Sequence, residues 1–247
     1  MLVRVMTWNI CTGRNWKKIV QLIEAKRAEI IGLQEVDNSF RESTEGVDVC
    51  KNIGRALGYY CAYCPSIEIA DKTKTRQYGN CIVSRFPILK SQKHFLSPEI
   101  PWNQKSFETE PRTLLETRIK IGKTIVRFMT THLAYSHKFQ TSQIKLRQIR
   151  TVLNLIESNK QYPSILCGDF NSLPESQEIK EIEKHLINVG KNSMNWTTYR
   201  NVSQANLEGT QGKIDYIFLS PEIKHKDLEI PETHLSDHLP VLVAVDL

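Results

Sequence analysis

An apolar run over residues 165–167 ends at Gly168, and Asp169 and Asn171 follow. In an extended segment, residues two positions apart point to the same side, so these two side chains can face one point beyond the end of a buried strand. Ligand sites in α/β proteins lie at such strand ends. A carboxylate beside an amide can take a proton from water and steady a charged oxygen or a cation. The same Asp-x-Asn pattern also forms Asx-turns that cap a following helix, so a purely structural role stays open.

Side chains that can bind a metal or transfer a proton recur where the predicted strands end or begin. Beyond the first pair, they are Asn9, Gln34, Glu35, His132, Asp215, Asp237 and His238. A single polar residue at a strand end is usually part of a turn. Recurrence along the whole chain instead predicts that the strand ends converge on one cleft.

Hydrophobic periodicity predicts more strands than helices. The predicted strands cover residues 2–8, 29–33, 59–64, 79–84, 113–120, 123–131, 163–168, 213–219, 223–230 and 239–246. The predicted helices cover residues 15–28, 47–57, 139–158 and 175–185. A doubly wound parallel sheet would alternate strand and helix more strictly. Hairpins mixed with crossovers favour an α/β (α+β) fold, in which two mixed, mostly antiparallel sheets pack face to face with helices outside, in a single domain over residues 1–247.

Two long segments, 65–77 and 97–111, match neither periodicity. Loops of this length inside a compact domain are often functional, and both segments carry basic residues, with Trp102 in the second. They are therefore candidates for substrate contact, with an ordinary surface loop as the alternative. The solvated face of the long helix is expected to carry its basic residues Lys145, Arg147 and Arg150.

The composition is ordinary for a globular protein with a sizeable core, at 40% hydrophobic and 24% charged residues out of 247. A formal net charge of +6 fits an anionic substrate without requiring one. No run approaches about 18 consecutive apolar residues, so no transmembrane segment is predicted. A strand pattern begins at Leu2 with no signal-peptide pattern, which favours a cytoplasmic protein, although a removed leader would leave no trace.

Six cysteines are present, and Cys61 and Cys64 form a lone C-x-x-C pair. A zinc site needs a second pair of ligands at matching spacing, and none follows, so zinc or a redox pair is a minor alternative. Cys81 and Cys167 lie in apolar runs and are expected to be buried thiols. This cysteine usage favours a reducing compartment.

Seven short motifs together resemble the endonuclease/exonuclease/phosphatase superfamily, the group of DNase I, abasic-site endonucleases, sphingomyelinases, inositol-polyphosphate phosphatases and deadenylases. In chain order, the motifs are Thr7-Trp8-Asn9-Ile10, Leu33-Gln34-Glu35-Val36, the run from Tyr78-Gly79-Asn80 to Pro87-Ile88, Thr131-His132-Leu133, Gly168-Asp169-Phe170-Asn171, Ile214-Asp215-Tyr216-Ile217 and Ser236-Asp237-His238. Each motif is weak alone, but all seven come in the family's order and span almost the whole chain. The resemblance implies a four-layered α/β/β/α sandwich, hydrolysis of phosphate esters and a divalent metal, usually Mg²⁺, with Mn²⁺ as a substitute.

The resemblance implies that Glu35 is the principal metal ligand, and Mg²⁺ indeed prefers one or two carboxylates and keeps several waters. Asn9 would assist at the metal or hold Glu35 and the phosphate, and Asp237 would add to the metal site directly or through water. Asn80 and Arg112 would lie near the phosphate. Each of these residues could instead be a turn, core or surface residue.

The resemblance also implies roles for residues at the reacting phosphorus. Asp169 would orient or deprotonate the attacking water, and Asn171 would hydrogen-bond that water or the phosphate. His238 would donate to a non-bridging oxygen, with Asp215 fixing its tautomer. His132 would be a second donor on the opposite side of the phosphate. The structural alternatives are a buried core Asp at 215 and a core histidine at 132.

The first motif departs from that of abasic-site endonucleases, which usually carry a second polar residue in Asn-x-Asn or Asn-x-Asp. Here Asn9 is followed by Ile10 and Cys11, which favours the family's small general-purpose hydrolases over a dedicated repair enzyme. One interpretation is a phosphodiesterase or nuclease that acts by in-line water attack, with aromatic side chains that stack on bases. The aromatic candidates for stacking are Trp102, Trp196 and Tyr78.

Two other functions remain open. The first is a phosphatase or phospholipase C-like hydrolase that acts on a phospholipid headgroup or a soluble phosphate ester. The second is a binding module that has lost catalysis, which the complete set of site residues disfavours. The expected partner is a phosphate-ester substrate, with nucleic acid among the candidates, and the chain is expected to be a monomer.

Overall fold

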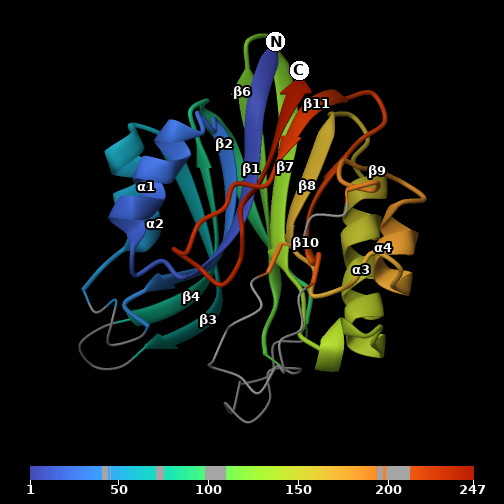
Figure 1. Ribbon diagram of the computed structural model, residues 1–247, viewed down its shortest axis with the longest axis horizontal. Helices are drawn as coiled ribbons and strands as arrows, with labels where there is room; N and C mark the ends of the chain where they lie inside the picture. Colours follow the sequence, from blue (N-terminus) through green and yellow to red (C-terminus); the bar gives the residue numbers. More distant parts are fainter. Residues whose placement is uncertain (41–43, 45, 71–74, 98–109, 194–196, 199–211) are drawn as a thin grey trace.

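The central strands are nearly continuous apolar runs because both of their faces are buried. In β1 (Leu2–Thr12), Val3 and Val5 face one hydrophobic layer, whereas Met6 and Trp8 face another. The computed structural model describes residues 1–40, 44, 46–70, 75–97, 110–193, 197–198 and 212–247. It arranges such strands into two six-stranded sheets that pack face to face (Figure 1).

Each sheet joins strands from distant parts of the chain. The first sheet holds, in spatial order, β11 (Lys224–Glu229), β12 (Val241–Asp246), β1, β2 (Ile30–Asn38), β4 (Thr75–Ser84) and β3 (Tyr60–Ala70). The second holds β5 (Ile88–Phe95), β6 (Thr113–Ile121), β7 (Thr124–His132), β8 (Ser164–Asp169), β10 (Asp215–Leu219) and β9 (Ile187–Asn188). Apolar side chains from the inner faces of both sheets form one shared core.

Helices cover the outer face of each sheet (Figure 1). The first sheet carries α1 (Trp16–Ala25) and α2 (Val49–Leu57), and the second carries α3 (Gln143–Glu157) and α4 (Gln177–Ile182). A separate hydrophobic cluster lies under each pair of helices. The predicted four-layered α/β/β/α sandwich is therefore confirmed.

Two strand pairs are parallel, β1 with β2 and β7 with β8, and the other described pairs are antiparallel. Each parallel pair is joined by a crossover through a helix, α1 in the first sheet and α3 in the second. The carboxyl ends of parallel partners lie at the same edge of a sheet. In the second sheet, His132 and Asp169 are the last residues of β7 and β8. In the first sheet, Asn9 and Glu35 lie within β1 and β2, where the register of each strand shifts.

The structure differs from several predicted elements, and β1 and β2 continue past the predicted ends at residues 8 and 33 to Thr12 and Asn38. Most of segment 65–77 is strand rather than loop. β3 continues to Ala70, β4 begins at Thr75, and the two strands pair with each other along this length. β5 was not predicted, since its exposed edge position lacks the alternation of a half-buried strand. The long helix begins at Gln143 rather than at residue 139, with Ser142 as its N-cap. Residues 98–109, most of the second predicted loop, lie outside the described residues.

The expectation that Cys81 is a free buried thiol is wrong, because Cys50 and Cys81 form a disulfide between α2 and β4. Their Cα atoms lie 6.1 Å apart, within the range that a disulfide spans. Cysteine usage therefore no longer favours a reducing compartment. Cys61 and Cys64 do not act as a pair, because Cys61 is exposed and Cys64 is buried in the core between the sheets.

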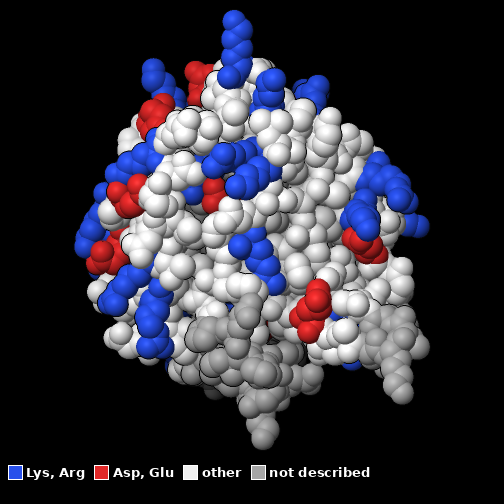
Figure 2. Space-filling view, turned by 180° about the vertical axis from the view of Figure 1, so that it is seen from behind, with Lys and Arg blue, Asp and Glu red and all other residues white. Residues whose placement is uncertain are grey.

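Charge is dispersed over the face of the molecule seen in Figure 2, where Lys and Arg side chains are spread widely with Asp and Glu between them. The described residues on this face form no continuous basic stripe of the kind that tracks a nucleic-acid backbone. None of the helices in the described part of the chain has the length and apolar character needed to cross a membrane.

A buried ion network links β5, β6 and β7 to the end of α3. Glu116 accepts a hydrogen bond from Arg127 Nε at 2.8 Å and contacts His94 Nε2 at 3.0 Å. Arg127 also donates to the carbonyls of Leu155 and Asn159. Burial alone would raise the pKa of Glu116, but the hydrogen bonds with His94 and Arg127 outweigh it and lower the pKa to about 2.

Replacing Glu116 with Gln is expected to lower the free energy of unfolding at pH 7 by about 2–3 kcal/mol, because Arg127 then stays buried without its counter-charge. Since the folded-state pKa of Glu116 is depressed, this stabilisation is present above its ordinary value of 4.5 and is lost as the pH falls toward 2. Urea unfolding of both proteins between pH 7 and pH 3 measures the difference, which should shrink with acid. The exposed carboxylate of Glu157 provides the control variant Glu157→Gln, and an E116Q difference that does not change with pH would refute the assignment.

Candidate active site

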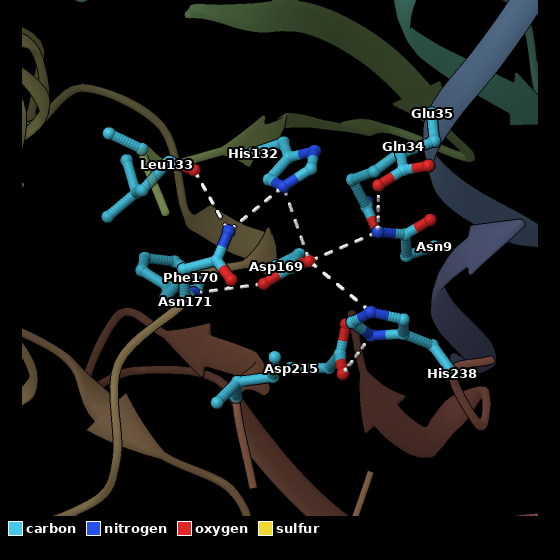
Figure 3. Close-up of polar contacts among 12 residues, drawn as sticks. Asn9, Gln34, Glu35, His132, Leu133, Asp169, Phe170, Asn171, Asp215 and His238 are labelled. Carbon is cyan, nitrogen blue, oxygen red and sulfur yellow. Dashed lines mark hydrogen bonds and ion pairs between the residues drawn. The ribbon is translucent and has the colours of Figure 1, made fainter. Parts of the chain in front are cut away.

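The registers of the strands bring the predicted site residues to one edge. In the second sheet, His132 pairs with Asp169 in the parallel β7–β8 register, and Asp215 pairs with Asp169 on its other side. In the first sheet, the parallel β1–β2 register pairs Asn9 with Gln34, and Asn9 contacts the neighbouring Glu35. The two edges face each other, and side chains from both meet in one cluster (Figure 3).

Gly168 permits the close approach of β8 to β7 at this edge. Its φ is +144°, and a Cβ at this position would lie 2.0 Å from the carbonyl oxygen of Thr131. Any side chain here would force the two strands apart and carry Asp169 away from His132. This steric constraint explains why a glycine precedes Asp169 in the sequence.

Asp169 is the centre of the cluster and is 1% exposed. Its Oδ2 accepts a hydrogen bond from Asn9 Nδ2 at 3.1 Å, and its Oδ1 accepts one from the backbone N–H of Asn171 at 2.9 Å. Oδ2 also lies 3.4 Å from His132 Nε2 and 3.7 Å from His238 Nε2. Burial raises the pKa of Asp169 to about 7, against the opposing charge of His238. A carboxylate with a pKa near neutrality is suited to take a proton from water.

His238 and Asp215 form a buried pair. A carboxylate can only accept, so His238 Nδ1 donates to Asp215 Oδ2, at 2.9 Å. Burial alone would lower the pKa of His238, but Asp215 and Asp169 outweigh it and raise the pKa well above its ordinary value. This raised pKa favours the protonated ring, whose Nε2 lies 3.7 Å from Asp169 Oδ2. Its backbone is held by Trp8 Nε1, which donates to the carbonyl of His238 at 2.9 Å.

The tautomer of His132 follows from the orientation of Asn171. Asn171 Nδ2 lies 3.1 Å from the carbonyl oxygen of Leu133, which can only accept, so the amide nitrogen rather than the oxygen occupies this position. The same Nδ2 lies 3.0 Å from His132 Nε2, which must then accept and leave the proton on Nδ1. Burial, together with the charges of Arg112 and His238, lowers the pKa of His132 well below its ordinary value. His132 is therefore a neutral ring with its donor at Nδ1.

Glu35 reaches the site from within β2, where the β2–β4 register shifts and its backbone is left-handed with φ +56°. Its Oε1 accepts a hydrogen bond from Asn9 Nδ2 at 3.1 Å, so the amide of Asn9 bridges the carboxylates of Glu35 and Asp169. The other end of that amide, Oδ1, accepts from the backbone N–H of Cys11 at 3.1 Å. This geometry gives Asn9 the task of holding Glu35, and direct metal ligation by Asn9 stays a prediction.

A pocket opens beside Glu35. It is lined by Glu35, Ser66, Tyr78, Gly79, Asn80, Arg112, Thr113 and His132. Asn80 Nδ2 donates to the carbonyl of Thr113 at 2.9 Å, which joins the two sheets at the pocket wall. Arg112 pairs with Glu110 at 3.2 Å, while its buried Nε has no hydrogen-bond partner among the described residues. Asn80 and Arg112 thus line the same pocket as Glu35, and their predicted contact with phosphate stays a prediction.

The donor set suits a hard divalent cation, because it consists mainly of carboxylate oxygens. Ligand atoms of Asp169, Asp215 and His238 lie within 4.8 Å of one another, and this buried cluster could hold a metal. Asp215 and His238 already satisfy each other by a hydrogen bond, however. Glu35, a half-buried carboxylate at the pocket wall, is therefore the better first ligand. Asp237 lies beside His238, with its Oδ1 3.1 Å from Ser236 Oγ, and its part in a metal site stays a prediction.

Two buried polar residues without a predicted role hold the site together. Gln34 Nε2 donates to Thr7 Oγ1 at 3.1 Å and to Thr130 Oγ1 at 2.7 Å, which ties the two sheets together directly before Glu35. Ser236 Oγ donates to the carbonyl of Asn9 at 2.7 Å and anchors the loop that carries His238. Both residues belong to the sequence motifs, so their position beside a predicted site residue was the available signal.

The prediction that Lys145 lies on a solvated face is wrong, because its side chain is 0% exposed. Its Nζ donates to the carbonyl of Asn171 at 2.6 Å. Helical spacing could have indicated this burial, since Lys145 precedes the buried Ile149 by four residues and Val152 by seven. Arg147 and Arg150 are exposed, as predicted.

The described residues offer no exposed aromatic platform at the pocket. Tyr78 is 6% exposed and packs against Phe40, with ring centroids 5.8 Å apart. Trp102 and Trp196, the other candidates for base stacking, lie outside the described residues. The aromatic argument for nucleic acid therefore finds no support in the described part of the chain.

Comparison with known proteins agrees with this geometry. The family model described as "Endonuclease/Exonuclease/phosphatase family" matches residues 6–238. A family protein from Bacteroides thetaiotaomicron has a similar structure, with a TM-score of 0.77 and 22% identity over 100% of this chain and 99% of that one. The structure of a mannosyl-6-phosphatase from the same species is similar with a TM-score of 0.74. Its sequence identity is 20%, over 99% of this chain and 100% of that one. The human Nocturnin catalytic domain with bound sulfate is similar with a TM-score of 0.69 and 20% sequence identity. The match covers 99% of this chain and 93% of that one.

Proposed function

Because the chain belongs to the endonuclease/exonuclease/phosphatase family, we propose that it hydrolyses phosphate esters, with a water molecule activated at Asp169. The observation that carries this proposal is the position of Asp169. Its buried carboxylate lies between His238 and His132, and the side-chain amide of Asn9 and the backbone N–H of Asn171 each fix one of its oxygens. A held base with the His238 donor beside it matches what attack on a phosphate requires.

The reaction follows from these positions. Water held at Asp169 attacks the phosphorus in line with the ester bond, and its proton passes to the carboxylate of Asp169. Negative charge builds up on the non-bridging oxygens, where His238 Nε2–H and His132 Nδ1–H donate from two sides. The unpartnered Nε–H of Arg112 adds a third donor at the pocket wall. The ester oxygen leaves with the electron pair of the broken P–O bond.

A divalent cation, Mg²⁺ with Mn²⁺ as a substitute, would be held mainly by Glu35 and would supply charge neutralisation for the phosphate and the leaving oxygen. Glu35 is suited to this because Asn9 fixes its Oε1 and the rest of the carboxylate faces the pocket. Asp237 would support the cation directly or through water.

The first choice of substrate is a phosphodiester, with a nucleic acid among the candidates. The second choice is a phosphomonoester or a phospholipid headgroup, and two observations favour it. Arg112 and His132 present two donors to one small pocket, which suits the extra charge of a monoester. A structurally similar protein is a mannosyl-6-phosphatase.

A substrate panel with Mg²⁺ and with excess EDTA tests the proposed function. The panel holds a bis-aryl phosphodiester, single- and double-stranded DNA, RNA, sphingomyelin, an inositol phosphate and a sugar 6-phosphate. We expect turnover of at least one member in Mg²⁺ and its loss with EDTA, since the donors alone cannot neutralise the phosphate. Turnover of none of them in Mg²⁺ or Mn²⁺ would refute the hydrolase and support a silent binding module.

A further inference from the structure

Lys145 is a fully buried cation on α3 to which the proposed reaction assigns no role. Its ammonium donates to the carbonyl of Asn171 at 2.6 Å and to that of Phe139 at 3.4 Å, and it lies 3.7 Å from Glu178 Oε1. Burial lowers the pKa of Lys145 to about 8, so keeping the charge in this position opposes folding at neutral pH. A charge kept at such a cost requires a reason beyond packing.

Asn171, the partner in the shortest of these contacts, has a demanding conformation. Its backbone is left-handed with φ +46°, which costs a non-glycine residue free energy but is tolerated best by Asn and Asp. This conformation directs its amide to His132 and the carbonyl of Leu133, and its N–H to Asp169. The backbone conformation of this one residue therefore sets the contacts of Asn171 with both Asp169 and His132.

The ammonium of Lys145 is itself held from the far side. Glu178 on α4 is also 0% exposed, and it accepts hydrogen bonds from the Ser142 N–H at 2.9 Å and from Thr141 Oγ1 at 2.7 Å. These contacts fix the start of α3 against α4 and leave the carboxylate facing Lys145. The chain of contacts thus runs from α4 through Glu178 and Lys145 to the carbonyl of Asn171.

We propose that Lys145 is a positioning residue of the site, whose ammonium holds the carbonyl of Asn171 and thereby the amide that sets the tautomer of His132. This inference rests on the proposed hydrolysis at the same site. A purely structural role, as a tie between α3 and α4, would need only the contact with Glu178. The contact with Asn171 is shorter by about an ångström, and it points toward the chemistry.

Replacing Lys145 with Met keeps the length of the side chain and removes its donors. We expect kcat to fall about 10- to 100-fold with KM changed less than about threefold, as for other residues that orient a catalytic group. Lys145→Arg, which retains a cationic donor, should recover most of this loss. Val152→Ala, on the same helix, is the control for lost stability, and Arg147→Met is the control for a lost positive charge. Neither variant should change kcat.

The ¹⁵N NMR signals of the His132 ring give a readout that needs no substrate. In the wild type, the proton should reside on Nδ1. K145M should shift the population toward the Nε2–H tautomer, whereas V152A should not. An unchanged tautomer in folded K145M, or an equal loss of kcat in K145M, K145R and V152A, would overturn the proposal. Should K145M fail to fold, K145R must keep the wild-type tautomer. Because the NMR test is independent of turnover, failure of the proposed function and failure of the positioning role are distinguishable.

Discussion

Replacing Asp169 with Ala is expected to lower kcat about 10³- to 10⁴-fold, near the upper end for loss of a general base. The water would lose the carboxylate that orients it and takes its proton. Stability should change little, because burial raises the pKa of Asp169 and so opposes its charged form in the folded state. Turnover and thermal unfolding of the same preparation measure the two effects.

Asp169→Asn separates the base from its position, because Asn can still accept the hydrogen bond from the N–H of Asn171. Its loss of kcat should be nearly as large as that of the Ala variant. Asp227→Asn, which alters an exposed carboxylate on β11, is the control and should retain full turnover. Near-normal turnover in D169A would show that another group activates the water.

His238→Gln is expected to lower kcat about 10²- to 10³-fold, because it removes the cationic donor to the phosphate oxygens. Asp215→Asn should cost a similar factor, since an amide can donate to Nδ1 and favour the wrong tautomer of His238. His238 and Asp215 are hydrogen-bonded at 2.9 Å and act as one unit. The kcat of the double variant should therefore be at most about threefold lower than that of H238Q alone.

A double-variant cycle of kcat measures this coupling. If the losses multiplied, His238 and Asp215 would act independently and the pair would not be the donor. The control pair is His94 and Glu116, which lie 3.0 Å apart in the ion network of β5, β6 and β7. Variants of that pair should change stability and leave kcat unaffected.

Much of the fold could be predicted because each strand of the core repeats a simple pattern. The β6–β7 hairpin, with Gly122 at its turn, and the helix end at Gly58 lie where local signals place them. β5 could not be predicted, because an exposed edge strand gains little from apolar alternation. The Cys50–Cys81 bond joins residues 31 positions apart, and connectivity of this kind does not follow from spacing.

The site residues likewise divide into those that the sequence predicts and those that it does not. Asn9, Glu35 and Asp169 were predicted because each follows an apolar strand run in the sequence, so that their neighbours in sequence also place them in space. Lys145 and Gln34 were not, because their roles depend on which carbonyl or hydroxyl another element brings to them. The tautomer of His132 likewise depends on a contact across 39 positions of the chain.

Hydrolysis of a phosphate ester in ¹⁸O-labelled water tests the central claim most directly. The account predicts that the substrate turned over in Mg²⁺ yields a phosphate product with one ¹⁸O atom from water, seen by the isotope shift of its ³¹P signal, and an unlabelled alcohol. D169A should abolish this labelled product. Label in the alcohol, or labelled phosphate formed equally well by D169A, would contradict attack on phosphorus by a water held at Asp169.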